Sequence, residues 1–277
     1  MNPIIYNIPA SMTAGYGNRR VIIRADDPEL IIRVVEQEKP GNLEYIQLLS
    51  TKIDPKAMDN LAQWETDVPL DIIVNNPATE FPLLYNFSKI AGNRPVRISI
   101  AVKPGFIKAV RLAAALRFSI KLLVKQPNVQ LIRELFEVLD FYLHRTNVTE
   151  PIEYFHTLFL SLYHGEPVNL WTIQEEDPDL FRFVDDNGVE TVSPRLAGAN
   201  LEKIRGDLLV AGIAANQASV NECYACQFRE SCGGYFKWTD QNYDCTGVKT
   251  IFGALSAAVA ALKKDVAAST RRQGGAQ

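Results

Sequence analysis

The chain has 277 residues, of which 47% are hydrophobic and 22% charged, so it is large enough for one domain with a small appendage. Its formal net charge of −3 excludes the global basic field that nucleic-acid binding would need. No apolar run approaches the roughly 18 residues that span a bilayer, and the N-terminal segment lacks the features of a secretory signal. We therefore expect a cytoplasmic protein with neither nucleic acid nor membrane as its partner.

Five short apolar runs recur through the first half of the chain. They lie at 21–25, 45–49, 70–74, 96–102 and 119–124. Each run is followed by a turn residue and then by a stretch with helical spacing. Short apolar strands that alternate with helices predict a parallel sheet. The expected fold class is therefore α/β, a partial (β/α) barrel of parallel strands.

Helix starts agree with this alternation. Asp27-Pro28 and Asp54-Pro55 each place a capping carboxylate before a proline that suits the first helical turn. After the fifth run the pattern changes, and longer elements are predicted. These are helices over 129–145 and 152–163, a hairpin at Asp186-Asn187-Gly188 and a closing helix over 248–267.

The acidic run Glu175-Glu-Asp-Pro-Asp179 is interpreted as a solvated turn and helix start, with a docking patch as the alternative. His144, His156 and His164 are the only histidines in the chain. His156 and His164 are eight residues apart, and no carboxylate stands at metal-ligand spacing between these two, so we expect packed or solvated imidazoles rather than ligands.

All the cysteines of the chain stand in one short stretch. They are Cys223, Cys226, Cys232 and Cys245. In a reducing compartment such thiols suit zinc or an iron–sulfur cluster. Only the first two form the close pair of a zinc knuckle, whereas a cluster tolerates irregular spacing. Gly233 and Gly234 would permit positive φ and a close approach of amides to sulfur. Four unpaired buried thiols remain the alternative.

The run Cys223-x2-Cys226-x5-Cys232, followed by Gly-Gly and a later Cys245, resembles the C-terminal SPASM domain of radical S-adenosylmethionine enzymes. The pattern in that family is Cys-x2-Cys-x5-Cys-x3-Cys-gap-Cys. The resemblance implies one auxiliary [4Fe–4S] cluster held by the four cysteines. The position that serves the other auxiliary cluster is Phe236 here, and no upstream cysteine exists, so that second cluster should be absent.

The upstream β/α units resemble the partial barrel of these enzymes only in architecture, over about residues 20–126, whereas the motif covers about 221–252. The family carries a Cys-x3-Cys-x2-Cys loop after its first strand, but the run at 21–25 leads into Asp26-Asp27 with no cysteine. The second run ends Leu49-Ser-Thr-Lys52, without the family's Gly-Gly-Glu. The resemblance therefore implies a degenerate member that neither binds nor cleaves S-adenosylmethionine.

In a barrel of parallel strands, function is expected at the carboxyl ends of the strands. The polar residues there are Arg24, Asp26, Lys52, Asn75, Asn76, Lys103, Lys125 and Gln126. Their cations would suit an acidic peptide or a phosphate-bearing ligand. The alternative is that these ends simply meet water.

These patterns divide the chain into a partial barrel with a helical extension (1–200), a SPASM-like iron–sulfur domain (201–270) and a disordered tail (271–277). The function expected is that of an auxiliary or partner subunit in peptide modification of the RiPP type, which binds a peptide or a partner maturase. One alternative is a catalytic subunit whose radical chemistry a partner chain supplies. The other is a zinc-stabilised binding protein with no redox role. The sequence leaves open whether the protein is an enzyme.

Overall fold

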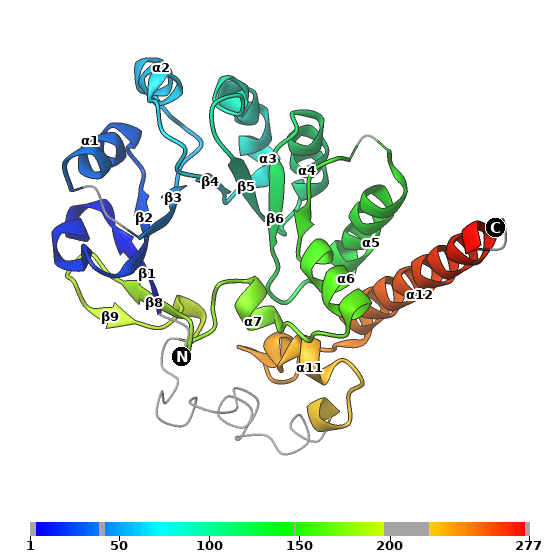
Figure 1. The fold of residues 1–277 in the computed structure, drawn as a ribbon. Helices are drawn as coiled ribbons and strands as arrows, with labels where there is room; N and C mark the ends of the chain where they lie inside the picture. Colours follow the sequence, from blue (N-terminus) through cyan, green and yellow to red (C-terminus); the bar gives the residue numbers. More distant parts are fainter. Residues whose placement is uncertain (1–3, 39–41, 147, 197–221, 275–277) are drawn as a thin grey trace.

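The computed structural model describes residues 4–38, 42–146, 148–196 and 222–274. Within these ranges the strands are β1 (Ile5–Pro9), β2 (Arg20–Ala25), β3 (Leu43–Leu48), β4 (Leu70–Val74), β5 (Val96–Ala101), β6 (Ser119–Leu123), β7 (Ile152–Glu153), β8 (Phe181–Val184) and β9 (Glu190–Thr191). They form one sheet in the order β7-β6-β5-β4-β3-β2-β1-β8-β9 (Figure 1). Neighbouring strands are parallel except for β8 and β9, which are antiparallel.

The five predicted strands are β2 to β6, and the hairpin at 186–188 joins β8 to β9; both predictions are confirmed. The sheet begins one strand earlier than predicted, with β1 between β2 and β8. Asn7 interrupts the apolar run of β1 and Pro9 ends it, which hides this strand in the sequence. The segment that follows β1 also lacks cysteine.

Helices connect most of the parallel strands. In the described ranges they are α1 (Pro28–Glu38), α2 (Pro55–Gln63), α3 (Pro77–Glu80), α4 (Phe106–Ala115), α5 (Val129–His144), α6 (Phe155–His164), α7 (Leu170–Ile173), α11 (Arg229–Cys232) and α12 (Thr246–Gly274). The 3-10 segments are η1 (Ala10–Tyr16), η2 (Phe81–Lys89), η3 (Pro194–Leu196) and η4 (Tyr235–Lys237). Asp54 caps α2 as predicted, since its carboxylate accepts the amide hydrogen of Lys56 at 2.9 Å. The helix predicted from residue 152 begins only at Phe155, because 152–153 pair with β6 as β7.

The helices α1 to α5 cover one face of the sheet, while α7 and α11 lie on the other side (Figure 1). The covered face is apolar, with Ile46, Ile72, Ile98 and Ile120 almost completely buried. The structure is therefore α/β, as predicted, and the strand order with helices along one face is consistent with a partial β/α barrel. We call the face opposite α1 to α5 the inner face.

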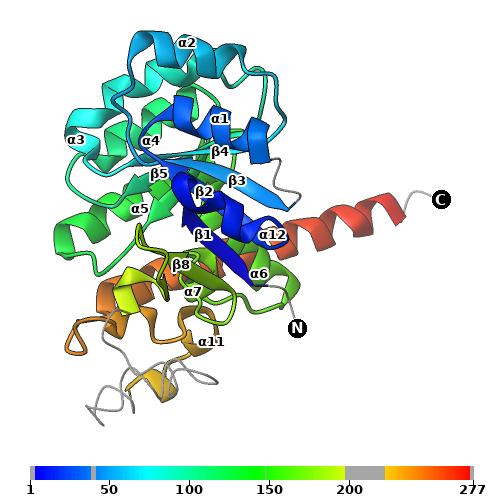
Figure 2. The ribbon, with the colours of Figure 1, turned by 90° about the vertical axis from the view of Figure 1, so that its left-hand side faces the viewer.

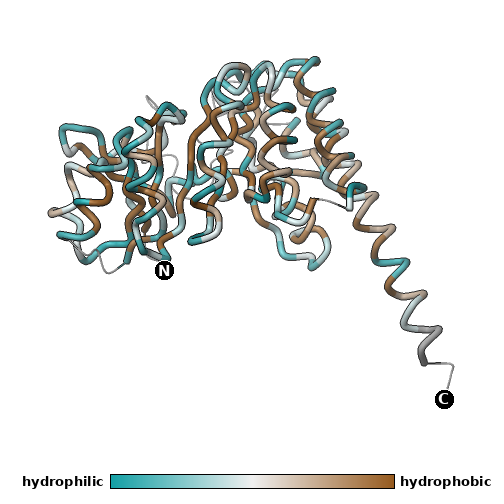
Figure 3. The backbone as a smooth tube through the Cα atoms, turned by 90° about the horizontal axis from the view of Figure 1, so that it is seen from above, coloured by the Kyte–Doolittle hydropathy of each residue, from teal (hydrophilic) through white to brown (hydrophobic). Residues whose placement is uncertain are grey.

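The closing helix is confirmed and is longer than predicted. Val248, Ile251, Phe252, Leu255 and Val259 of α12 are buried in the body of the protein. Residues 260–270 are exposed, and this end of the helix projects from the molecule (Figures 2 and 3). Among the described helices, none combines the length and apolar character that crossing a membrane requires. The predicted domain boundary near 201 and the last residues of the predicted tail lie outside the described residues.

Candidate functional site

The four cysteines line one cavity in the first half of the described segment 222–274. Cys223 and Cys226 precede α11, Cys232 ends it, and Cys245 directly precedes α12. The amide of Cys226 donates a hydrogen bond to the carbonyl oxygen of Cys223 at 3.2 Å, which closes a tight turn between the first two thiols. Local turns and two helix ends thus bring together side chains that are up to 22 residues apart in the sequence. The spacing predicted this proximity, whereas metal binding stays a prediction.

The Gly-Gly pair gives the cavity its main-chain donors. Gly233 and Gly234 have φ values of +58° and +72°, in the left-handed region that glycine adopts most readily. This turn directs the backbone amides of Tyr235 and Phe236 at the sulfur of Cys232, where their hydrogen bonds favour the thiolate. The predicted positive φ and amide approach are therefore present. Such donors are typical of sulfur atoms that carry negative charge.

Burial raises the pKa of Cys223, Cys232 and Cys245, which favours the protonated thiol at these three positions in the metal-free chain. It raises the pKa of Cys232 to about 11 despite the two amide donors, and it raises the pKa of Cys245 to about 12. The pKa of Cys223 is also raised, mainly by burial and then by the charge of Glu222. A metal centre would have to displace these protons, because only the thiolate is a ligand.

A buried cation stands beside the sulfurs. Lys237 is only 4% exposed, yet its ammonium donates a hydrogen bond to the carbonyl oxygen of Tyr243 at 2.8 Å and pairs with Glu222 at 2.7 Å. Lys249 pairs with the other oxygen of Glu222 at 2.8 Å. The two lysines and one carboxylate leave a positive balance at the cavity wall, which suits an anionic centre of thiolates and metal.

Two kinds of metal centre can be compared with this set of donors. Among the described residues, no group of three or more His, Cys, Asp or Glu side chains is found that could hold a metal ion. The four thiols line a shared cavity. Zinc requires all four sulfurs about 2.3 Å from one point, whereas a [4Fe–4S] cluster places each thiolate on a different iron. The choice between a cluster and zinc stays a prediction.

Hydrogen bonds attach the cysteine segment to the end of β6. The amide of Gln126 donates to the carbonyl oxygens of Phe236 and Asp240, both at 2.9 Å. The hydroxyl of Tyr235 donates to the carbonyl oxygen of Val124 at 2.8 Å. Phe236 itself is fully buried and stacks against Tyr243 with a centroid separation of 6.2 Å. These hydrogen bonds thus attach the cysteine cavity to the carboxyl ends of the strands, where function was expected.

The remaining residues predicted at the carboxyl ends of the strands behave differently from one another. The guanidinium of Arg24 turns back and donates to both the backbone and the side-chain oxygen of Asn7 at 2.7 Å. Lys103 donates to the carbonyl oxygen of Asn75 at 3.0 Å. The exposed residues of this set are Asp26, Lys52, Asn75, Asn76, Lys103 and Lys125. Binding of a peptide or phosphate by these exposed groups stays a prediction.

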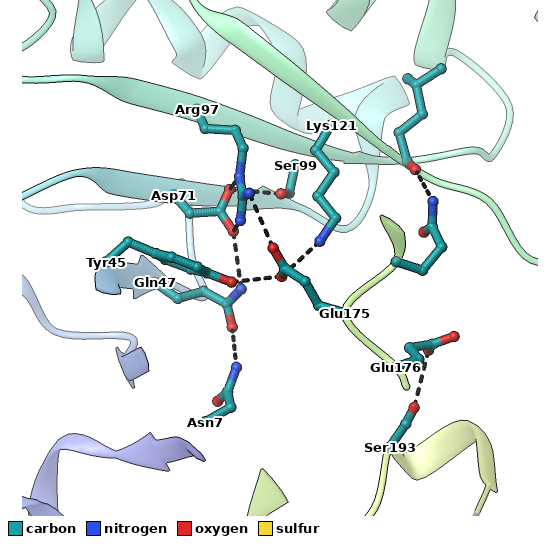
Figure 4. A network of polar contacts seen from close by, with 12 residues as sticks. Asn7, Tyr45, Gln47, Asp71, Arg97, Ser99, Lys121, Glu175, Glu176 and Ser193 are labelled. Carbon is teal, nitrogen blue, oxygen red and sulfur yellow. Dashed lines mark hydrogen bonds and ion pairs between the residues drawn. The ribbon is translucent and has the colours of Figure 1, made fainter. Parts of the chain in front are cut away.

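A polar row that the sequence did not predict crosses the inner face (Figure 4). Its members on the consecutive strands β3 to β6 are Tyr45, Gln47, Asp71, Arg97, Ser99 and Lys121. Asn7 of β1 joins them across β2, since its side-chain amide donates a hydrogen bond to Gln47 at 3.3 Å. Asp71 is the centre: it accepts two hydrogen bonds from Arg97, at 3.0 and 3.1 Å, and one from Ser99 at 2.6 Å. The signal was a charged residue at an alternate position within an otherwise apolar strand.

Glu175 completes this row, which corrects the interpretation of the acidic run as a solvated turn. Its carboxylate pairs with the buried Lys121 at 2.7 Å and with Arg97 at 3.2 Å, and it accepts a hydrogen bond from Tyr45 at 2.6 Å (Figure 4). Burial alone would raise the pKa of Glu175, but the charges of Lys121 and Arg97 outweigh it and lower the pKa to about 2. Glu175 has a φ of +60°, which is uncommon for a residue other than glycine.

The neighbouring acid joins the row to the cysteine segment. Glu176 accepts a hydrogen bond from Ser193 at 3.1 Å. Its other carboxylate oxygen lies 2.9 Å from the hydroxyl of Tyr235, whose single hydrogen it shares with the carbonyl oxygen of Val124. Beside the row, a cavity of ≈ 510 Å³ opens at the amino ends of β4, β5 and β6. The charges of Asp71 and Glu175 balance those of Arg97 and Lys121, so we assign the row a structural role.

The histidines make ordinary contacts. The ring of His156 shares a hydrogen bond with the hydroxyl of Tyr142 at 2.7 Å, and exposed His144 pairs with Asp140 at 3.0 Å. His164 lies edge-on against Tyr163 with a centroid separation of 5.1 Å.

No protein-family model matches the chain, and neither a curated protein nor a solved structure matches it at a significant level. The resemblance to the SPASM domain therefore depends on the residues of the cysteine segment alone.

Proposed function

We propose that this protein carries one [4Fe–4S] cluster on Cys223, Cys226, Cys232 and Cys245. We further propose that it serves as an auxiliary or partner subunit in peptide modification, in the cytoplasm. One observation carries the first part: all four thiols face one cavity that also supplies main-chain amides and a buried lysine. Each of these features stabilises negative charge, which four thiolates on a metal centre possess.

The residues of this chain would hold the group and set its environment. The amides of Tyr235 and Phe236 would stabilise the thiolate of Cys232. The charge of Lys237 would lower the energetic cost of thiolates at Cys223 and Cys245. When bound, the cluster would supply one-electron transfer. Phe252 and Phe228, which stack with a centroid separation of 5.2 Å, also line the cavity and limit access of water.

The proposed ligand set leaves no thiol for radical chemistry. A radical cluster needs three protein thiolates and one iron that is free to bind S-adenosylmethionine, and the chain has only these four cysteines. We therefore propose that the isolated protein does not cleave S-adenosylmethionine. Its role would be to bind a peptide or a partner maturase, with the exposed Lys52, Lys103 and Lys125 at the strand ends as candidate contacts.

Zinc remains the second candidate, because Cys223 and Cys226 have the spacing of a knuckle. It is the weaker one, since Cys232 and Cys245 do not form a second close pair.

Metal analysis after anaerobic purification tests the proposal. We expect about four iron and four sulfide per chain, from the composition of the cluster, together with a brown colour that is lost in a variant with all four cysteines changed to serine. Stoichiometric zinc without labile sulfide would contradict the proposed iron–sulfur cluster. In a second assay, dithionite-reduced protein receives S-adenosylmethionine. Formation of 5′-deoxyadenosine above the level of the serine variant would show that one iron is open.

A further inference from the structure

The cavity beside the polar row is distinct from the cysteine cavity. Its volume of ≈ 510 Å³ falls within the range of about 300–1,000 Å³ that small-molecule sites occupy. It opens at the amino ends of β4, β5 and β6, whereas hydrogen bonds attach the cysteine segment just beyond the carboxyl end of β6. Its lining includes none of the four cysteines. Any ligand of this cavity is therefore separate from the proposed metal centre.

Much of the lining is apolar. Leu70 and Val96 of the sheet contribute to it, as do Val168 and Ile173 from the segment around α7. Prolines that directly precede β4, β5 and β7 add rigid apolar surface, and these are Pro69, Pro95 and Pro151. The cavity therefore suits a ligand with a hydrocarbon part.

A buried ammonium group at the cavity has hydrogens left over. Lys121 lines the cavity, and its side chain is only 4% exposed. Among the described residues its ammonium has one partner, the carboxylate of Glu175 at 2.7 Å (Figure 4). An ammonium carries three hydrogens that it can donate, and buried donors are normally all bonded. Two hydrogens of Lys121 therefore remain for an acceptor in the cavity.

A carboxylate without a cation lies beside this ammonium. Glu153 of β7 stands opposite Lys121 of β6 in the register, so both side chains are on the inner face, and both line the cavity. Lys121 nevertheless pairs with Glu175. Among the described residues Glu153 has no ion-pair partner, and its Oε2 accepts one hydrogen bond, from Thr157. The other oxygen, Oε1, remains for a donor in the cavity.

The charge of the lining follows from these pairs. The remaining charged groups are neutralised within the chain, in the pairs Asp71 with Arg97, Glu175 with Lys121, and Glu44 with Arg20. Glu153 is left over, which gives the cavity one excess negative charge. A ligand with one positive charge would neutralise it, and a ligand with a net negative charge would be repelled.

We infer that this cavity binds an α-aminoacyl group, that is, a primary ammonium beside a carbonyl carbon, with an apolar side chain. The ammonium donates to Oε1 of Glu153, and the carbonyl oxygen accepts from Lys121. The apolar lining receives the side chain. The amino end of a peptide and a free amino acid both present this group. The excess negative charge favours the peptide end, because its carbonyl oxygen is uncharged. The site depends on neither the cluster nor the exposed lysines at the strand ends.

Calorimetric titration of the full chain tests the inference with three small probes. Leucinamide has the ammonium, an uncharged carbonyl and an apolar side chain. Leucine replaces the amide by a carboxylate, and N-acetylleucinamide lacks the ammonium. Each probe is titrated into the parent protein, Glu153→Gln and the control Glu137→Gln, whose carboxylate lies outside the cavity and is 60% exposed. Unfolding in urea establishes that each variant is folded.

Leucinamide should bind the parent protein saturably and at least about tenfold more tightly than N-acetylleucinamide, because a hydrogen-bonded charge pair is lost in the acetylated probe. Glu153→Gln should weaken leucinamide binding by a similar factor, and Glu137→Gln should leave it unchanged. A further variant, Ser119→Leu, adds apolar volume to a half-buried position of the lining and should abolish binding. It keeps the test decisive if Glu153→Gln does not fold.

Each outcome has one meaning. Absence of binding by leucinamide and leucine to the folded parent protein overturns the inference. Equal affinity for leucinamide and N-acetylleucinamide also overturns it, because the ammonium would then not be recognised. Binding that survives Ser119→Leu places the probe outside the cavity and overturns the site. Tighter binding of leucine than of leucinamide supports the site and identifies a free amino acid as its ligand. None of these results affects the metal analysis, so the two proposals can fail separately.

Discussion

The indole nitrogen of Trp171 donates a hydrogen bond to the carbonyl oxygen of Gly233 at 2.9 Å. The ring of Trp171 also lies edge-on against Tyr235, with a centroid separation of 4.9 Å. These contacts join α7, just before Glu175, to the turn that follows Cys232. The polar row on the inner face and the cysteine cavity are therefore parts of one connected arrangement.

This contact makes Gly233 sensitive to substitution. A β-carbon there would lie 3.1 Å from Cδ1 of Trp171, at a φ that favours glycine. Gly233→Ala should therefore destabilise the protein by about 1–2 kcal/mol and reduce metal content. Gly253→Ala in α12 is the matched control: nothing lies within 4 Å of the added carbon, and a gain of about 0.5–1 kcal/mol is expected. Equal effects of the two changes, in urea unfolding, would contradict this account.

Loss of a ligand should loosen α12. Cys232→Ser or Cys245→Ser should abolish cluster binding, and α12 begins directly after Cys245. Because binding of the proposed cluster would be coupled to folding, its loss should accelerate amide hydrogen exchange at the buried positions within 248–259. The exposed residues 260–270 serve as an internal control and should not respond. Unchanged protection of 248–259 after cluster loss would argue against the coupling.

Substitution of the two lysines at the cavity should change metal content and reduction potential to different extents. Lys237→Gln removes a buried cation beside the sulfurs and should lower both metal content and the reduction potential. Lys249→Gln removes a cation that pairs with the same Glu222, but its side chain is 37% exposed, so solvent screens its charge. A smaller shift is expected. The reduction potentials of the two variants are measured by potentiometry. A larger shift of the potential in Lys249→Gln than in Lys237→Gln would contradict the importance of burial.

Glu175 should make stability depend on pH in the acidic range. Its pKa is about 2 in the folded protein and ordinarily 4.5, so the carboxylate contributes stability above pH 4.5 that is lost as the pH falls toward 2. The 2.5-unit difference corresponds to about 3 kcal/mol. Glu175→Gln should lose about 3–5 kcal/mol at pH 7, because Lys121 is left buried without a partner. It should also flatten the dependence of stability on pH below 4.5.

The control for this change is Glu137→Gln, whose carboxylate is 60% exposed. It should alter stability by less than about 0.5 kcal/mol at any pH. Unfolding in urea at a series of pH values measures both variants. Parallel curves for Glu175→Gln and the parent protein would refute the assignment of the buried pair.

The central strands could be predicted because β2 to β6 consist largely of β-branched and leucine residues at regular intervals. Very short strands could not be predicted. The sequence at 152–153 is compatible with the start of a helix, and only its pairing with β6 makes it the two-residue strand β7. Tertiary contacts decide such cases.

The polar row was missed for a related reason. Arg97 and Lys121 stand in apolar runs, where they count as minor interruptions, and Glu175 stands in an acidic run that resembles a surface turn. Only the register that places these charges side by side shows that they neutralise one another. The proximity of the four cysteines was easier to predict, because four residues within 23 positions of the chain cannot lie far from one another.

The order of these elements along the chain bears on how the protein is made. The last of the described strands ends at Thr191, and the first cysteine follows at 223. A ribosome therefore delivers all the described strands before any thiol, and domains fold in the order of their synthesis. While they wait for metal, the thiols with raised pKa react slowly with oxidants, since the thiolate is the reactive form. We expect iron and sulfide added to the already folded, metal-free protein to load it as fully as when they are present throughout refolding, and a clearly lower yield would show that assembly must accompany folding.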